Sequence, residues 1–136
     1  MISCVQGERA FESGTMFLVT VNKAKQVLFF SFIGNVTADQ LVESHDEVAM
    51  MINDLKPGFR VLTDMGRLDS VSVDCGVEIG KTMELCDQNG VELIVRVIPD
   101  PKKDIGLSIL SLFHYSRRPR TVTCESMVEA AKVLSL

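Results

Sequence analysis

From residue 26 onward, short β-rich runs alternate with segments of helical periodicity. The β-rich runs cover about residues 26–33, 59–64, 91–98 and 120–124, and a helical pattern follows each of them. A connection that carries a helix joins two parallel strands, because the chain must return along the sheet before it pairs again. Right-handed crossovers that proceed in one direction along a sheet place their helices on the same face. The sequence therefore predicts an α/β fold with parallel later strands and helices mainly on one face.

A hairpin precedes this alternation. Two β-rich runs, Met16–Val21 and Gln26–Ile33, are separated by four residues, which is a common hairpin loop length. The second run contains VLFFSFIG, which is almost continuously apolar, as in a strand covered on both faces. We therefore expect a mixed five-stranded sheet in the order ββαβαβαβα, with the antiparallel first hairpin at one edge. We place a single domain at residues 16–136 and a loosely attached N-terminal arm at 1–15.

Two of the expected helices carry capping signals. Thr37 followed by Gln40 is a capping box for the first helix, and the sequence Lys56-Pro57-Gly58 ends that helix. Ser126 followed by Glu129 is the same signal for the last helix. These pairs fix where the two helices begin.

The second helix is expected to begin at about Ser72 or Asp74 and to end at Asn89-Gly90. Its inward stripe consists of Cys75, Ile79, Met83 and Cys86. Gly76 and Gly80 flank this stripe on the same side. We expect these two glycines to let the helix lie close to the sheet.

The composition excludes several kinds of function. A net charge of −4 and a pI of about 5.1 provide no basic field for nucleic acid or an anionic membrane surface. No apolar run reaches the roughly 18 residues that a membrane-spanning helix needs. The first residues lack a basic-then-apolar order and the four cysteines form no CxxC pair, so we expect a cytoplasmic protein with reduced thiols.

Metal and cofactor motifs are not found in the sequence. His45 and His114 fall at no zinc-ligand spacing. No GxGxxG sequence follows a strand, and no GxxxxGK[ST] sequence occurs. We therefore expect no metal site, no cofactor and no catalytic residue.

Four segments agree in type and order with one known family. They are IGNVTADQL at the first helix, VLTDM in the third β-rich run, QNGVELIVRVI at the step into the next run, and ESMVEAAKVL at the last helix. Together with the order of elements, these segments resemble the STAS domains, the family of bacterial anti-sigma-factor antagonists, over about residues 16–134. The resemblance is closest to a divergent STAS-like branch. It implies a regulatory role exerted through a protein partner, such as an anti-sigma-like regulator.

The start of the second helix departs from this family. Typical antagonists have an Asp-Ser-Ser-Gly-like sequence there, and a partner kinase phosphorylates one of the serines. This chain has Val73-Asp74-Cys75-Gly76, so Cys75 stands at the phosphoacceptor position. A thiol cannot replace the hydroxyl in that switch. Ser70 and Ser72 lie upstream, in no context that marks them for modification.

The resemblance places a partner site on the loop Met65–Gly76 and the start of the second helix. A helix N-terminus that follows a parallel strand is also a natural anion site. The candidate partner- or ligand-binding residues are Asp64, Asp69, Ser70, Ser72, Asp74, Cys75, Gly76 and Arg96.

Three of the candidate side chains have two interpretations each. Near a helix N-terminus Cys75 could be a reactive thiolate, whereas on the inward stripe it would be a buried structural cysteine. Arg96, together with Asp64, could anchor a ligand at the carboxyl end of the sheet, or the two could form an internal ion pair. His45 lies on the apolar stripe of the first helix, as a half-buried histidine or as a catalytic base.

The helical pattern at Asp104–Tyr115 is apolar on more than one side. Leu107, Leu110 and Phe113 are the candidate interface residues of this segment. A helix that is apolar nearly all round must bury a second face. That face could contact a partner or a second subunit, line a pocket, or pack in the core.

Three functions compete at this point. The leading hypothesis is a non-enzymatic regulatory or protein-interaction module, which could form a homodimer. The alternative is a binding protein for a small apolar or amphipathic, lipid-like ligand held between the third helix and the sheet, by analogy with related folds. The third hypothesis is an enzyme that uses Cys75 or His45.

Overall fold

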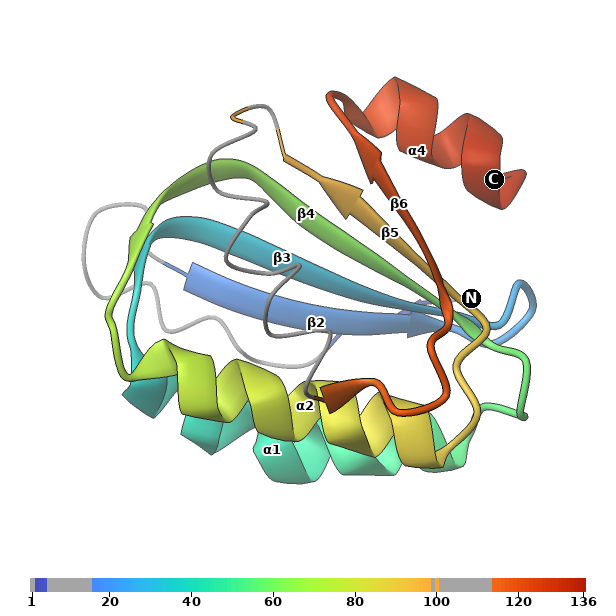
Figure 1. Cartoon of the computed structure of the whole chain (residues 1–136), viewed down its shortest axis with the longest axis horizontal. Coiled ribbons are helices and arrows are strands. Elements are labelled where there is room, and N and C mark those ends of the chain that lie inside the picture. Colours follow the sequence, from blue (N-terminus) through green and yellow to red (C-terminus); the bar gives the residue numbers. More distant parts are fainter. Residues whose placement is uncertain (1, 5–15, 99, 101–113) are drawn as a thin grey trace.

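The protein is a single mixed β-sheet with helices on both faces (Figure 1). The computed structural model describes residues 2–4, 16–98, 100 and 114–136. The elements are β1 (Ile2–Cys4), β2 (Met16–Asn22), β3 (Val27–Val36), α1 (Ala38–Asn53), β4 (Arg60–Val71), α2 (Cys75–Gln88), β5 (Leu93–Val97), β6 (Arg120–Cys124) and α4 (Met127–Leu134). The expected interface residues Leu107, Leu110 and Phe113 lie outside the described residues.

The predicted α/β fold is confirmed. The strands lie in the order β1-β2-β3-β4-β5-β6, with β2 antiparallel to β3 and all later pairs parallel. The five expected strands are β2 to β6. The structure adds β1, which pairs antiparallel with β2 from Ile2 opposite Asn22 to Cys4 opposite Thr20. The hairpin therefore lies one strand inside the edge of the described sheet.

The helices divide between the two faces of the sheet. The crossover helices α1 and α2 pack side by side on one face, as expected, and α4 lies on the opposite face (Figure 1). Strand β3 has apolar side chains against both layers, because Phe30 belongs to the core cluster under α1 and α2 while Val27 belongs to the cluster under α4. The continuous apolar run of this strand is thereby explained.

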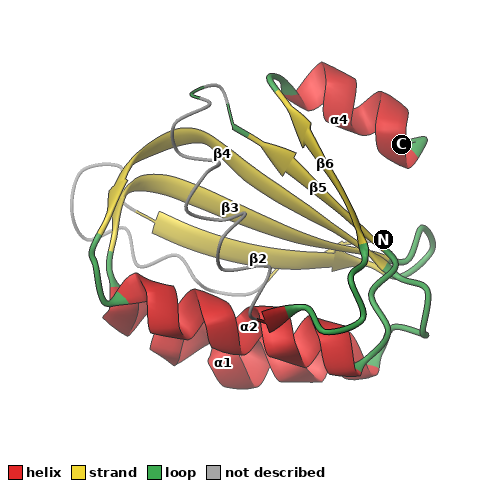
Figure 2. Cartoon of the chain, viewed as in Figure 1, coloured by secondary structure: helices red, strands yellow, loops and turns green. Residues whose placement is uncertain are grey.

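Strand β4 is longer than the sequence predicts. It was expected to end at Asp64, but it continues to Val71 before a short turn leads into α2 (Figure 2). The extension pairs with the second half of β3, ending with Val36 opposite Val71. Pairing with β5 covers only Arg60 to Asp64. Most of the expected loop is therefore strand, and the connection proper is Ser72–Asp74.

The expected role of the α2 glycines is wrong. A Cβ atom added to Gly76 would meet nothing within 4 Å, so this position is open rather than pressed against the sheet. A Cβ atom on Gly80 would lie 2.6 Å from Nε2 of His114. Gly80 therefore makes room for the imidazole ring of His114, not for a strand.

The expected helix caps are present. Oε1 of Gln40 accepts a hydrogen bond from the backbone N–H of Thr37 at 2.9 Å, before α1 begins. Oγ of Ser126 accepts one from the backbone N–H of Glu129 at 3.3 Å, at the start of α4. Each bond satisfies a backbone donor that would otherwise lack an intrahelical partner.

Candidate functional site

The turn between β4 and α2 is held by backbone hydrogen bonds. Ser72 N–H donates to the carbonyl of Val36 at 3.3 Å, which ties the turn to the end of β3. Cys75 N–H donates to the carbonyl of Ser72 at 3.0 Å, and Gly76 N–H donates to the carbonyl of Val73 at 3.4 Å. These three bonds therefore hold the backbone of the turn in place.

Three valines around this turn are exposed to solvent. Val73 is 100% exposed, Val77 in the first turn of α2 is 62% exposed, and Val71 at the end of β4 is 40% exposed. We call these three residues the turn patch. Scattered exposed apolar residues are ordinary, but several gathered at one turn indicate a contact surface.

The polar candidates near the turn are also exposed. Asp69, Ser70, Ser72 and Asp74 all face solvent. Oγ of Ser70 lies 2.6 Å from Oδ1 of Asn35 on β3 and donates to it. Asp74 precedes α2 and makes no side-chain capping bond. These residues therefore surround the turn patch with polar groups and two carboxylates.

Cys75 is completely buried at the first position of α2. Its Sγ lies 3.3 Å from Oγ of Ser72 and donates to the carbonyl of Val36 at 3.5 Å. The thiol has no exposed surface for a kinase, an oxidant or a substrate. The contacts of Cys75 are therefore those of a buried structural residue. Gly76 beside it is half-buried.

Asp64 and Arg96 lie on opposite faces of the sheet. Thr63 is directly opposite Arg96 in the β4–β5 ladder, and Asp64 is opposite Val97. Because successive side chains of a strand point to opposite faces, Arg96 faces α1 and α2 whereas Asp64 faces the other way. An Asp64 oxygen instead accepts from the backbone N–H of Gly66 at 2.9 Å. The predicted pairing of these two residues is wrong.

Arg96 lines a small cavity between the sheet and the helices. It is 3% exposed, and the cavity also contacts Phe32, Thr63, Cys86 and Tyr115. The cavity volume is about 50 Å³. One water occupies about 30 Å³ of liquid, whereas pockets for drug-sized ligands measure about 300–1,000 Å³. The lipid-like ligand of the alternative hypothesis would lie between this face of the sheet and residues 104–115, most of which are outside the described residues.

Two weakly acidic side chains beside this cavity, the Cys86 thiol and the Tyr115 phenol, are buried, and burial raises the pKa of each. Burial, with a smaller contribution from the charge of Asp87, raises the pKa of the Cys86 thiol to about 12. Burial also raises the pKa of Tyr115, and the nearby guanidinium of Arg96 opposes that shift. Both side chains therefore remain protonated in the folded protein at neutral pH, which makes Cys86 a poor nucleophile.

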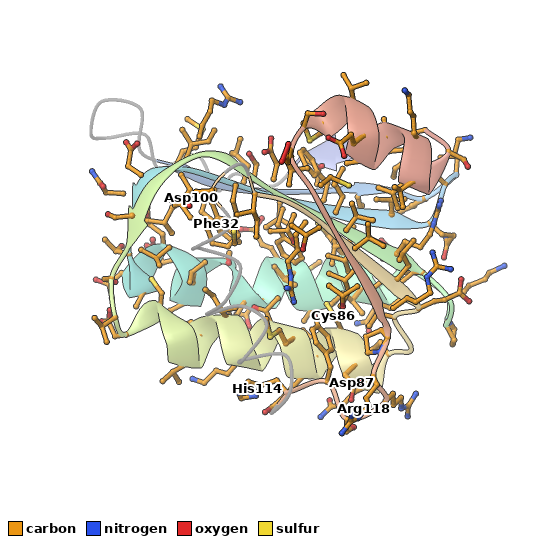
Figure 3. All side chains as sticks on the ribbon, turned by 45° about the horizontal axis from the view of Figure 1, so that its top comes forward. Phe32, Cys86, Asp87, Asp100, His114 and Arg118 are labelled. Carbon is orange, nitrogen blue, oxygen red and sulfur yellow. The ribbon has the colours of Figure 1, made fainter. Side chains whose placement is uncertain are left out.

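Three carboxylates of α2 contact residues of other segments, and the sequence analysis did not predict them. Oε1 of Glu78 on α2 lies 3.6 Å from Nε2 of His45 on α1, so His45 is half-buried beside a carboxylate. Glu84 pairs with Nδ1 of His114. Asp87, at the end of α2 (Figure 3), accepts hydrogen bonds from Oγ of Ser116 at 2.8 Å and from the backbone N–H of residue 117 at 3.1 Å. Only the folded chain brings these partners together, so no sequence spacing indicates them.

The described part of the chain offers neither a metal site nor a membrane-spanning helix. Among those residues, no group of three or more His, Cys, Asp and Glu side chains could hold a metal ion. No helix there is long and apolar enough to cross a membrane.

The fold is similar to solved structures of one class of protein. No protein-family model and no curated protein sequence matches the chain. An uncharacterized protein of the DUF3478 family with a SpoIIAA-like fold, from Shewanella loihica PV-4, is 14% identical with a TM-score of 0.63, over 98% of this chain and 93% of that one.

Two structures of SpoIIAA itself are also similar. The unphosphorylated anti-sigma factor antagonist SpoIIAA is 9% identical with a TM-score of 0.64, over 88% of this chain and 97% of that one. The phosphorylated form of SpoIIAA, a Bacillus cell fate determinant, is 12% identical with a TM-score of 0.54, over 86% and 98%. This chain therefore has the STAS-like fold of the anti-sigma-factor antagonists, as its sequence predicts.

Proposed function

We propose that this chain is a non-enzymatic, cytoplasmic interaction module that docks a regulatory protein on the turn patch. The observation that carries the proposal is the exposure of Val71, Val73 and Val77 around one hydrogen-bonded turn. The likeness in fold to an anti-sigma factor antagonist supports a regulatory partner. Asp64 and Arg96 have no part in this surface.

The energetics of the patch favour docking. Removing apolar surface from water contributes about 25 cal/mol per Å², so three valine side chains that become buried would supply several kcal/mol. A turn held by its own backbone bonds loses little further conformational freedom on binding. The turn patch therefore has the properties of a small, preorganised anchor for a partner.

The proposed module lacks the usual phosphorylation switch. A phosphoacceptor must reach the active site of a kinase, and Cys75 is buried and hydrogen-bonded within the fold. Occupancy of the docking site would then follow the concentrations of the two proteins and their affinity. No covalent change at position 75 is needed.

Site-specific photocrosslinking in the native cells tests this proposal. A photoreactive residue replaces Val73, and in a matched control it replaces Val128, which is 66% exposed on α4 at the opposite face. We expect a crosslinked protein, identified by mass spectrometry, at Val73 and none at Val128. The purified partner should then bind Val73→Ser/Val77→Ser at least about tenfold more weakly than wild type, since each lost valine contact costs about 1 kcal/mol or more.

Two results would oppose the proposal. One is the same set of crosslinked proteins from both positions. The other is a purified partner whose affinity is unchanged by the double substitution Val73→Ser/Val77→Ser and reduced by Val128→Ser.

A further inference from the structure

A further exposed apolar side chain lies on α1. Val42 is 51% exposed. The two helices run parallel, because each leads from the end of one parallel strand back to the start of the next (Figure 1). Nε2 of His45 on α1 lies 3.6 Å from Oε1 of Glu78 on α2, so the two helices are adjacent at these positions.

Val42 lies at the same end of the helix pair as the turn patch. It precedes His45 by one helical turn, as Asp74 precedes Glu78. Because residues three or four apart share a helix face, Val42 and Asp74 border the same end of the contact between α1 and α2. A partner that covers Val77 at the start of α2 therefore also reaches α1.

The exposed face of α1 carries only acidic charges, beside the exposed apolar side chains of Val42 and Met50. Its four carboxylates all face solvent: Asp39, Glu43, Asp46 and Glu47. The helix contains no Lys or Arg between Ala38 and Asn53. The neighbouring helix α2 contains one lysine, Lys81, whose Nζ lies 3.5 Å from Oε1 of Glu78.

Several exposed cations of the described residues lie at the other end of the molecule, whereas Arg67 on β4 and Lys81 on α2 are exposed elsewhere. Lys23 and Lys25 lie in the β2–β3 turn, Lys56 follows α1, and Arg118 and Arg120 lie at the start of β6. These positions are near the ends of α1 and α2 and the beginnings of the parallel strands (Figure 1). Within the described residues the charge is therefore unevenly distributed, and the turn patch lies toward the acidic end.

We infer that the partner of the turn patch is a protein with a basic surface, in which lysines and arginines surround apolar side chains, and that it contacts the acidic face of α1 as well as α2. This inference depends on the proposed docking function. Like charges placed opposite each other across an interface cost several kcal/mol, which excludes an acidic partner surface. The same repulsion excludes nucleic acid and anionic lipid from this face.

A second copy of this chain is a poorer match than a basic partner. Several exposed cations of the described residues lie at the end opposite the acidic face, so pairing them with that face in a second copy requires a head-to-tail contact. Head-to-tail contacts form rings or open filaments rather than a two-fold dimer. The inferred partner is therefore a different protein.

Titration with a defined probe tests the inference without the native partner. The probe is a synthetic amphipathic Lys/Leu helical peptide, and its Glu/Leu counterpart of equal length is the negative control. We expect NMR shifts from the Lys/Leu peptide at amides of α1 and of residues 72–77, and none from the Glu/Leu peptide. Binding should weaken strongly at high salt, because exposed charges are screened.

A matched pair of double variants separates local from overall charge. Asp46→Asn/Glu47→Gln removes two of the four carboxylates of α1, and Glu125→Gln/Glu129→Gln removes the same charge beside and within α4. We expect the first variant to bind the Lys/Leu peptide about fivefold or more weakly, and the second to stay within about twofold. Equal weakening by both variants, or shifts spread over the whole chain, would overturn the inference.

Two further outcomes keep this inference apart from the proposed function. A partner crosslinked at Val73 but insensitive to Asp46→Asn/Glu47→Gln would sustain the docking function and overturn the basic-partner inference. Concentration-dependent self-association in sedimentation, abolished by the same double variant, would assign the acidic face to a second copy and overturn it too. Absence of any crosslinked partner would instead remove the docking function itself.

Discussion

At the scale of single residues, burial decides what Cys75 can do. The helix N-terminus would favour a thiolate at this position. The side chain has no exposed surface, however, and its Sγ donates to the carbonyl of Val36. A reagent can therefore reach the thiol only when the end of β3 and the start of α2 separate.

Thiol labelling tests this interpretation of Cys75. In the native protein, we expect the Cys75 peptide to be labelled only at the rate of local or global opening, and this rate should rise with urea. The thiol introduced by Val73→Cys, two residues away at a fully exposed position, should react as fast as a free cysteine. Mass spectrometry of labelled peptides measures both rates. Equal rates at the two positions would contradict a buried structural role.

The residue scale also limits what the sequence could predict about the site. The sequence located the turn, since a strand followed by a helix start is visible in the order of residue types. It could not place Asp64 and Arg96, because a one-residue difference in strand register moves a side chain to the other face. The acidic face of α1 was also missed, since its place beside the turn depends on the packing of α1 against α2.

At the scale of elements, the pairing of β4 with β3 explains why the sequence predicted the end of β4 at Asp64 instead of Val71. Two register shifts interrupt the β3–β4 ladder, so that Ser31 and Ile33 pair with Asp64 and Arg67. Extra residues on β4 break the alternation of buried and exposed side chains that marks a strand. The order and type of the other described elements followed from periodicity and caps, except for β1, which lies in the segment expected to be an arm.

Two glycines of α2 provide a matched test of helix packing. Gly76→Ala meets open space, and we expect it to raise the free energy of unfolding by about 0.5–1 kcal/mol through helix propensity. Gly80→Ala would force the ring of His114 from its place beside Glu84. We expect Gly80→Ala to leave the protein at least about 1 kcal/mol less stable than Gly76→Ala does.

Urea unfolding of each variant, alone and combined with His114→Ala, measures this difference. Removing the ring should restore most of the helix-propensity gain at Gly80 and should not alter the effect at Gly76, because only the first pair is in contact. A Gly80→Ala variant as stable as Gly76→Ala, with His114 present, would refute the packing explanation.

At the scale of the whole molecule, two side chains in the core beneath α1 and α2 make the free energy of unfolding depend on pH in the alkaline range. The pKa of Cys86 rises from 9.0 to about 12 on burial, and that of Tyr115 rises above its ordinary value of 10.0. Below pH 9 the thiol is protonated in both the folded and the unfolded chain, so it contributes its full stability there. Above pH 9 the unfolded chain loses this proton and the folded chain keeps it. Stability must therefore fall as the pH rises.

We expect the free energy of unfolding to be insensitive to these groups below pH 9 and to decrease between pH 9 and about 12, with Cys86 alone contributing up to about 1.4 kcal/mol per pH unit. Urea titrations at a series of pH values measure this slope, and Cys86→Ala should reduce it. Tyr115 is the only tyrosine and the chain has no tryptophan, so phenolate absorbance should rise together with unfolding. A phenolate signal in the folded protein near pH 10, or a slope unchanged by Cys86→Ala, would show that these side chains are not sealed in the core.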